Sequence, residues 1–176
     1  MIAGIDPGVK GALALIDEND ASRVPLVFDL PYIGDIPDVR WLSAEVGIDW
    51  CDSDGPIPLC LFVVEQPIAM PGQSSKATAS TFRAYGALLA WVTLARIPLI
   101  TPRPNAWKAK LGVTRDKESS LALAARLFPG AGLHGPRGGA KDGRAEALLL
   151  AEYGRRHHVG VFRATSGSTR AHSVPL

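Results

Sequence analysis

The chain has 176 residues, which is enough for one domain with a core of its own, and its 47% apolar share is ordinary for a globular protein. No apolar run reaches the roughly 18 residues of a membrane span, and the first residues lack the basic start of a signal peptide, so we expect a cytoplasmic protein without membrane contact. The formal net charge of +2 hides an asymmetry, because residues 1–95 hold 5 basic and 12 acidic side chains while residues 96–176 hold 14 basic and 5 acidic; this favours a polyanion partner for the second half, with charge that only faces solvent as the alternative.

Two short strands are predicted at the start of the chain. Residues 2–6 form an apolar run that ends in Asp-Pro-Gly, and residues 11–17 follow as an antiparallel partner across a short connection. Residues 24–30 are expected to form a third strand, and one short helix is expected near 38–47 in the irregular segment that follows. The continuous apolar run at 59–65 is typical of a central strand covered on both faces.

The second half of the chain is predicted to be mainly helical after a loop at 70–76. Helices are expected at residues 77–95, 104–111, 116–128 and 142–157, with a short strand at 97–101 and a Gly-rich loop at 130–141. This pattern predicts an α/β fold with a mixed central sheet of about five strands and helices on both faces. A single domain should span residues 1–160, and residues 161–176 are expected to form a flexible tail.

Four acidic residues stand at the ends of these predicted core elements. Asp6 ends the first strand, Glu65 ends the central strand, and Asp142 and Glu146 lie one turn apart on the last helix. If the two strands are parallel neighbours, both strand-end carboxylates emerge at one edge of the sheet. Converging carboxylates are the ligands that a hard divalent cation prefers, so together they predict a metal-dependent enzyme that acts on phosphates.

Each of these acids also has a plainer interpretation. Asp6 could start a turn, Glu65 could be a solvated strand end, and Asp142 could cap the helix or complement its dipole. Glu146 is harder to explain in that way, because it repels Asp142 beside the apolar residues of the same helix. The cysteines and histidines do not have the spacing of metal ligands. The cysteines, Cys51 and Cys60, are expected to be reduced thiols. The histidines are expected to be surface residues: His134, His157, His158 and His172.

Five short motifs follow one another along residues 2–157 in an order that a known family shares. They are Gly4-Ile5-Asp6-Pro7-Gly8, Val64-Glu65-Gln66, Asn105-Ala106-Trp107-Lys108, Asp116-Lys117-Glu118-Ser119 and Asp142-Gly143-Arg144-Ala145-Glu146-Ala147-Leu148. This ordered set resembles the RuvC-type Holliday junction resolvases of the RNase H-like superfamily. The resemblance implies an RNase H-like fold, a homodimer, and a crossover junction endodeoxyribonuclease that cuts four-way DNA junctions by paired symmetric nicks.

The resemblance also implies roles for individual residues. Two divalent ions per site, Mg²⁺ or Mn²⁺, would be held by Asp6, Glu65, Asp142 and Glu146. Lys117 would be catalytic, with a solvated lysine at the start of a helix as the alternative, and Lys108 would lie near the scissile phosphate.

Two positions differ from the bacterial members of that family. Their last helix carries two aspartates three residues apart, whereas here the position three before Glu146 is Gly143 and the two acids are four apart. This spacing is closer to phage and plastid members. Ile68 stands where the bacterial enzymes place a phenylalanine that stacks at the junction.

DNA contacts are expected from basic side chains near the acids and from the loop at 70–76, whose alternative role is that of an ordinary connection. The residues concerned are Ile68, Met70, Lys76, Arg103, Lys108, Lys110, Arg115, Lys141 and Arg144. The helix at 77–95 carries apolar residues around much of its circumference, including Phe82, Leu88, Leu89, Trp91 and Val92. This favours a homodimer packed through that helix, and burial in the monomer core is the alternative.

Other functions are open to the same sequence. One is an RNase H-like nuclease that acts on RNA or on other branched nucleic acid, and another is a non-catalytic DNA-binding module, which would be expected to have lost an acid. An actin-like ATPase or sugar kinase would need a second domain, for which the length leaves no room. Residues 135–141 are no P-loop, because Lys141 is followed by Asp, and we expect no small-molecule cofactor.

Overall fold

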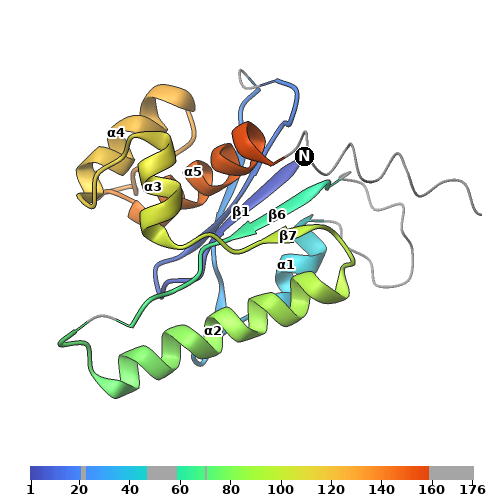
Figure 1. The fold of residues 1–176 in the computed structure, drawn as a ribbon, viewed down its shortest axis with the longest axis vertical. Helices are drawn as coiled ribbons and strands as arrows, with labels where there is room; N and C mark the ends of the chain where they lie inside the picture. Colours follow the sequence, from blue (N-terminus) through green and yellow to red (C-terminus); the bar gives the residue numbers. More distant parts are fainter. Residues whose placement is uncertain (21–22, 47–58, 70, 159–176) are drawn as a thin grey trace, which may run out of the picture.

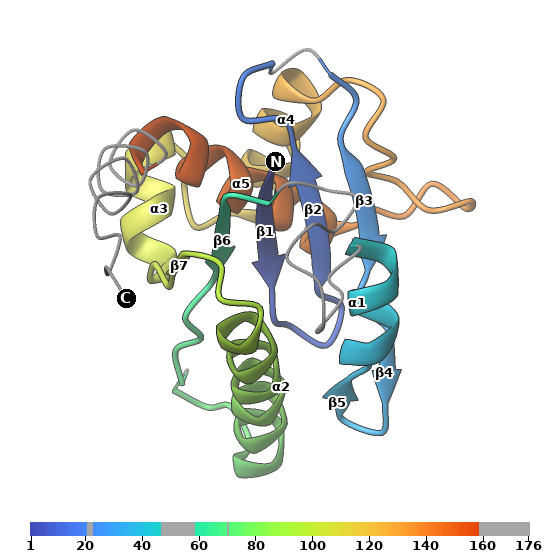
Figure 2. The same ribbon diagram turned by 90° about the vertical axis from the view of Figure 1, so that its right-hand side faces the viewer.

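The core of the protein is a mixed five-stranded sheet in the order β3-β2-β1-β6-β7 (Figure 1; Figure 2 labels all five strands). The strands are β1 (Ile2–Asp6), β2 (Ala12–Ile16), β3 (Leu26–Asp29), β6 (Leu61–Val64) and β7 (Leu99–Ile100). β1 pairs parallel with β6 and antiparallel with β2. At the two edges, β7 pairs parallel with β6 and β3 pairs antiparallel with β2. The structure is a computed structural model that describes residues 1–20, 23–46, 59–69 and 71–158.

Helices cover both faces of this sheet. Within the described residues they are α1 (Val39–Val46), α2 (Ser75–Leu94), α3 (Pro104–Leu111), α4 (Lys117–Leu127) and α5 (Asp142–His157). Figure 2 shows α1 and α2 in front of the sheet and α4 and α5 behind it, so the predicted mixed α/β fold is confirmed. A hairpin of β4 (Tyr32–Ile33) and β5 (Ile36–Pro37) forms in the segment that was expected to be irregular. No described helix is both long and apolar enough to cross a membrane.

The helix boundaries follow the capping residues. α3 and α5 have the predicted bounds, and α4 begins after Asp116, whose side chain accepts a hydrogen bond from the backbone N–H of Glu118 at 3.2 Å. α2 begins two residues earlier than predicted, because Ser74 Oγ accepts from the backbone N–H of Ala77 at 3.2 Å and caps the helix. Part of the expected loop at 70–76 is therefore the first turn of α2.

Some sequence predictions fall on residues that the structure does not describe. These are Cys51, Met70, His172 and the tail at 161–176. The thiol of Cys60, which lies in the described part of the chain, donates from Sγ to Glu18 Oε2 at 2.7 Å.

The central strands send alternate side chains into two core layers. From β1, Ile2 faces the layer that contains α3, α4 and α5, whereas Ile5 faces the layer of α1 and α2. Along β6, Val63 and Val64 divide between the same two layers. Both faces of these strands are buried, as their continuous apolar runs predict.

α5 packs directly against β1 because small residues line the contact. A Cβ on Gly4 would lie 2.1 Å from the backbone oxygen of Ala147 and 2.5 Å from the backbone nitrogen of Ala151. A Cβ on Gly154 would lie 2.6 Å from Cγ2 of Val63. These glycines set how closely α5 approaches the sheet, and they place the first turns of α5 at the end of β1.

Candidate metal centre

Two carboxylates meet at one edge of the sheet because β1 and β6 are parallel. The register pairs Ile5 with Val64, so the next residue of each strand, Asp6 and Glu65, emerges at the same edge. The backbone N–H of Glu65 continues the ladder by donating to the carbonyl of Ile5 at 3.0 Å. The condition that the sequence left open, a parallel pairing of the two strands, is therefore met.

A third carboxylate reaches the same point from α5. Glu146 stands just after the first turn of this helix, which the contact at Gly4 holds against β1. One carboxylate oxygen each from Asp6, Glu65 and Glu146 lies within 4.8 Å of the other two. We call these three residues the acid cluster; all three are partly buried.

The electrostatics of the acid cluster are those of charges held together away from water. Burial, followed by the charge of Glu146, raises the pKa of Asp6 from 3.8 to about 6. Burial is also the main cause at Glu65, whose pKa rises from 4.5 to about 7; the charges of Asp6 and Glu146 add to the rise, and the N–H of Trp107 opposes it. Ionising Asp6 and Glu65 is thus less favourable here than it would be in water.

Within the described residues, each acid of the cluster accepts a hydrogen bond. The donors are the Gly8 backbone N–H to Asp6 Oδ1 at 2.9 Å, the Trp107 indole N–H to Glu65 Oε1 at 2.8 Å, and Lys108 Nζ to Glu146 Oε1 at 2.6 Å. The ammonium of Lys108 thus already lies against the cluster as a positive charge. Carboxylate oxygens are the ligands of Mg²⁺ and Mn²⁺, so the donor set and its charge fit a divalent ion.

The raised pKa values predict how stability depends on pH in the absence of metal. The folded state holds a proton on Glu65 between about pH 4.5 and 7, whereas the unfolded chain releases it, so the Glu65 contribution to stability falls as pH rises through this window. The raised pKa corresponds to about 3 kcal/mol of lost stability above pH 7. In thermal melts with EDTA, Glu65→Gln should match the wild type at pH 4.5 and melt higher at pH 8. Equal melting temperatures at both pH values would contradict the prediction.

Asp142 stands apart from the acid cluster. Its carboxylate pairs with Lys117, Oδ2 to Nζ at 2.9 Å, and this hydrogen bond is the main reason why the pKa of Lys117 is raised. The N-cap position of α5 belongs to Lys141, so Asp142 is a first-turn acid and no cap. Its predicted place among the metal ligands stays a prediction, as does the catalytic role of Lys117.

Gly143, between the two acids of α5, lies directly against the connection between β1 and β2. A Cβ at this position would lie 2.1 Å from the backbone oxygen of Lys10 and 3.1 Å from Asp6 Oδ2. An aspartate at Gly143 would require the β1–β2 connection to move. The first-turn acid of α5, Asp142, lies one position earlier and accepts the hydrogen bond from Lys117.

No protein-family model and no curated protein matches the chain by sequence. Solved structures do match it. Thermus thermophilus RuvC in complex with a Holliday junction substrate is 19% identical over 94% of this chain and 95% of that chain, with a TM-score of 0.54. A second T. thermophilus RuvC structure is 18% identical over 88% of this chain and 95% of that chain, with a TM-score of 0.54.

The chain has the RNase H-like fold of RuvC. The predicted fold is thereby confirmed, and the agreement covers nearly the whole length of both chains. In this RuvC-like fold the acid cluster lies where β1, β6 and α5 meet.

Two of the predicted DNA contacts are engaged within the protein. Lys141 Nζ and Arg144 Nε pair with Asp29 at 2.9 and 2.7 Å, and Arg144 also donates to the backbone oxygen of Gly132 at 2.9 Å. These bonds fix the end of β3 and the Gly-rich loop to the start of α5. In this structure Lys141 and Arg144 connect α5 to β3 and to the Gly-rich loop. Their predicted contacts to DNA stay predictions.

Most of the other predicted DNA contacts are exposed on the surface. Ile68 is 43% exposed in the segment between β6 and α2. Four basic residues are exposed and have no ion-pair partner among the described residues: Lys76, Arg103, Lys110 and Arg115. Lys108 lies deeper, with its side chain 13% exposed beside Glu146.

Sequence reasoning missed the part that Trp107 plays. This residue belongs to the Asn-Ala-Trp-Lys motif, yet no role was assigned to it, and the structure places its indole N–H on Glu65. The available signal was a tryptophan on a short helix directly before a lysine that was itself expected at the site.

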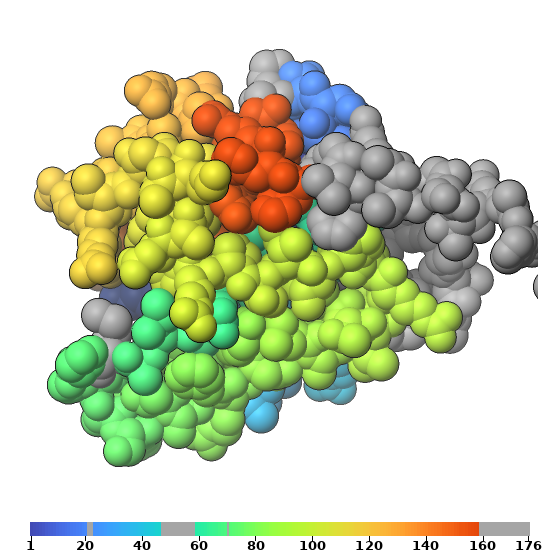
Figure 3. Space-filling view, viewed as in Figure 1, coloured from blue at the N-terminus to red at the C-terminus, as the bar shows by residue number. Residues whose placement is uncertain are grey.

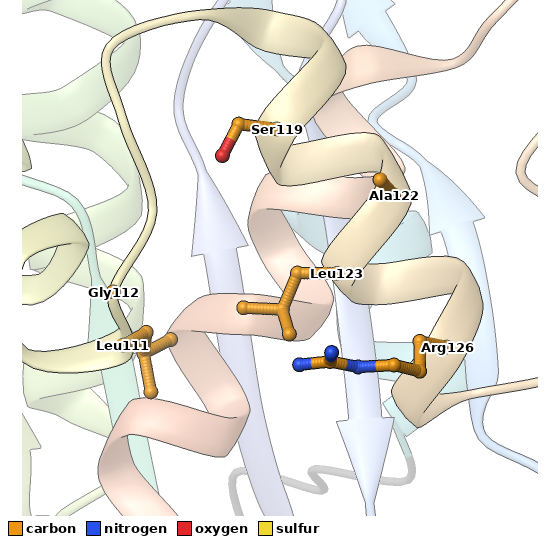
Figure 4. A pocket seen from close by; sticks show the side chains of 6 residues that line it. All are labelled: Leu111, Gly112, Ser119, Ala122, Leu123 and Arg126. Atoms are coloured by element: carbon orange, nitrogen blue, oxygen red, sulfur yellow. The ribbon is translucent and has the colours of Figure 1, made fainter.

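A pocket at the end of α3 contains none of the predicted site residues. It is lined by Leu111, Gly112, Ser119, Ala122, Leu123 and Arg126 (Figure 4).

Proposed function

We propose that this protein is a metal-dependent endonuclease that resolves four-way DNA junctions by paired symmetric nicks. The observation that carries the proposal is the convergence of Asp6, Glu65 and Glu146 within 4.8 Å at the end of parallel strands in a RuvC-like fold. The matched T. thermophilus RuvC was solved with a Holliday junction substrate, and this supports the same class of substrate here. The exposed basic residues Lys76, Arg103, Lys110 and Arg115 favour contact with a phosphate backbone.

The chain provides the groups that phosphodiester hydrolysis requires. Bound Mg²⁺ or Mn²⁺, two per site, would activate a water and neutralise charge on the leaving oxygen. Asp6, at the centre of the sheet, would bind both ions, and Glu65 and Glu146 would each favour one. Lys117 lies at the rim with its side chain 73% exposed, where it would stabilise the charge that develops on the phosphate.

A cleavage assay tests this function. A mobile four-way junction is incubated beside a linear duplex of the same sequence, with Mg²⁺ and with EDTA. We expect the junction to be cut in the presence of Mg²⁺ and to remain intact in EDTA. Equal cutting of the linear duplex, or a preference for RNA or for an RNA–DNA hybrid, would reject the resolvase in favour of another RNase H-like nuclease.

We also propose a homodimer that packs through the outward face of α2. Leu88, Trp91 and Val92 are buried in the monomer core. Burial within the monomer, the alternative to a dimer contact, therefore explains why these three residues are apolar. Phe82, in contrast, is 43% exposed, and Gly86 beside it on the outward face has room for a close approach. Figure 3 shows α2 along the lower edge of the molecule. A two-fold dimer would present two sites to the two-fold symmetry of a junction.

Sedimentation tests the dimer. The wild type is expected to sediment as a dimer at micromolar concentration, and Phe82→Asp should weaken the dimer by at least about tenfold, because it places a charge in an apolar contact. Val24→Asp is the matched control: Val24 is 67% exposed but lies before β3, away from α2, so this variant should remain dimeric. A wild-type monomer, with and without junction DNA, would rule the dimer out.

A further inference from the structure

Trp107 is a fully buried side chain that contacts the acid cluster. It lies in the core layer of α3, α4 and α5, with no exposed surface, and its Nε1–H donates to Glu65 Oε1 at 2.8 Å. A buried indole N–H needs an acceptor, and here the acceptor is a carboxylate away from water, where such a bond is stronger than one between neutral groups. Among the described residues no hydrogen bond engages Glu65 Oε2, which leaves that oxygen for a cation.

The ring of Trp107 also contacts Lys108, the lysine that pairs with Glu146. Lys108 Nζ lies 5.2 Å from the centroid of the indole ring, within the range of a cation–π contact. The same ammonium donates to Glu146 Oε1 at 2.6 Å, with the lysine side chain 13% exposed and the glutamate side chain 17% exposed. Trp107 thus reaches Glu65 directly and Glu146 through Lys108.

The backbone places Trp107 and Glu65 on a common support. Gln66, the residue after Glu65, donates its N–H to the carbonyl of Pro102 at 3.0 Å, just before α3 begins. The strand that carries the acid and the helix that carries the indole are therefore fixed to each other close to both side chains. The hydrogen bond between Trp107 and Glu65 joins two elements that are already held in place.

We propose that Trp107 is a positioning residue for the metal centre. Its N–H holds the carboxylate of Glu65 in one rotamer with the second oxygen turned to the ion, and its ring holds Lys108 beside Glu146. Groups that orient a metal ligand in this way contribute about 10- to 100-fold to metal affinity. This inference rests on the proposed function, because it requires that the acid cluster binds a divalent ion.

Titration calorimetry with Mn²⁺ and no DNA separates the two proposals. Trp107→Phe removes the N–H and keeps an aromatic ring, and it should lower Mn²⁺ affinity about 10- to 100-fold. Trp91→Phe is the matched control: Trp91 Nε1 donates to Ser43 Oγ at 2.8 Å in the opposite core layer, so this variant loses an equivalent buried bond and should keep wild-type affinity. Wild-type affinity in Trp107→Phe would overturn the positioning role and leave the metal centre intact, whereas a wild type that binds no Mn²⁺ would overturn both.

A measurement on the unaltered chain covers the case in which Trp107→Phe does not fold. The chain has four tryptophans, whose indole N–H resonances can be followed after ¹⁵N labelling. With Mg²⁺, the resonance of Trp107 should shift over the same concentration range as binding measured by calorimetry, and that of Trp91 should stay in place. A Trp107 resonance that does not move while Mg²⁺ binds would overturn the positioning role.

Discussion

Replacing Glu65 by glutamine is expected to lower the rate of junction cleavage by about 1000-fold or more. Glutamine keeps the size of the side chain and can still accept the indole N–H of Trp107, but it removes one negative ligand from the acid cluster. Metal ions contribute several kcal/mol to charge stabilisation in such reactions, and each tenfold in rate corresponds to about 1.4 kcal/mol. Asp6→Asn and Glu146→Gln should act in the same way.

Binding separates this loss from a general defect. Junction affinity should remain close to that of the wild type for all three variants, since the basic surface is unchanged and the cluster no longer repels phosphate. Glu45→Gln, an exposed acid of α1, is the matched control and should cleave at the wild-type rate. An active Glu65→Gln enzyme, or full wild-type activity in EDTA, would contradict the claim that the acid cluster binds a metal ion that catalysis requires.

Replacing Gly4 by alanine is expected to destabilise the protein by about 3 kcal/mol or more, which is the upper part of the range for overpacked cores. The new Cβ would lie 2.1 Å from one backbone atom of α5 and 2.5 Å from another, and neither can turn aside as a flexible side chain would. α5 would have to lift off β1 and would carry Glu146 away from Asp6. Cleavage should therefore fall together with stability, measured by urea unfolding and by the junction assay.

Gly139→Ala is the matched control for this substitution. Among the described residues, no atom beyond its chain neighbours lies within 4 Å of a Cβ at Gly139, which is an exposed position in the Gly-rich loop before α5. Alanine reduces the conformational freedom of the unfolded chain, so this variant should be at least as stable as the wild type. A Gly4→Ala protein as stable as the wild type would show that α5 is not held against β1 by this contact.

The sequence predicted that Asp6 and Glu65 each end an apolar strand. Two parallel neighbouring strands bring their carboxyl ends to one edge, but the sequence left the pairing itself open and the structure supplies it. The helix on which Glu146 lies was also predicted with its observed bounds.

The division of roles between Asp142 and Glu146 could not be predicted in the same way. The two residues differ by only about 40° around the helix, so periodicity gives both nearly the same direction. What separates them is the rotation of α5, which is set by contacts of Gly4 and Gly143 with distant backbone atoms. Such contacts depend on three-dimensional packing that the local pattern does not contain.

Long-range polar pairs were hidden for the same reason. Asp29 meets Arg144, 115 residues away, and Trp107 meets Glu65, 42 residues away. The basic residues on α5 were expected to face DNA because only their charge could be seen in the sequence. Their engagement with the carboxylate of Asp29 depends on β3 ending beside the start of α5.

The most direct measurement is the map of nicks on a four-way junction whose strands are labelled one at a time. The account predicts, with Mg²⁺, two nicks at symmetric positions in opposing strands, with products whose ends can be ligated directly. Junction shape should dominate over base sequence in the choice of site. Unpaired nicks scattered over all four strands, with the same cuts in a linear duplex, would contradict the assignment of a junction resolvase.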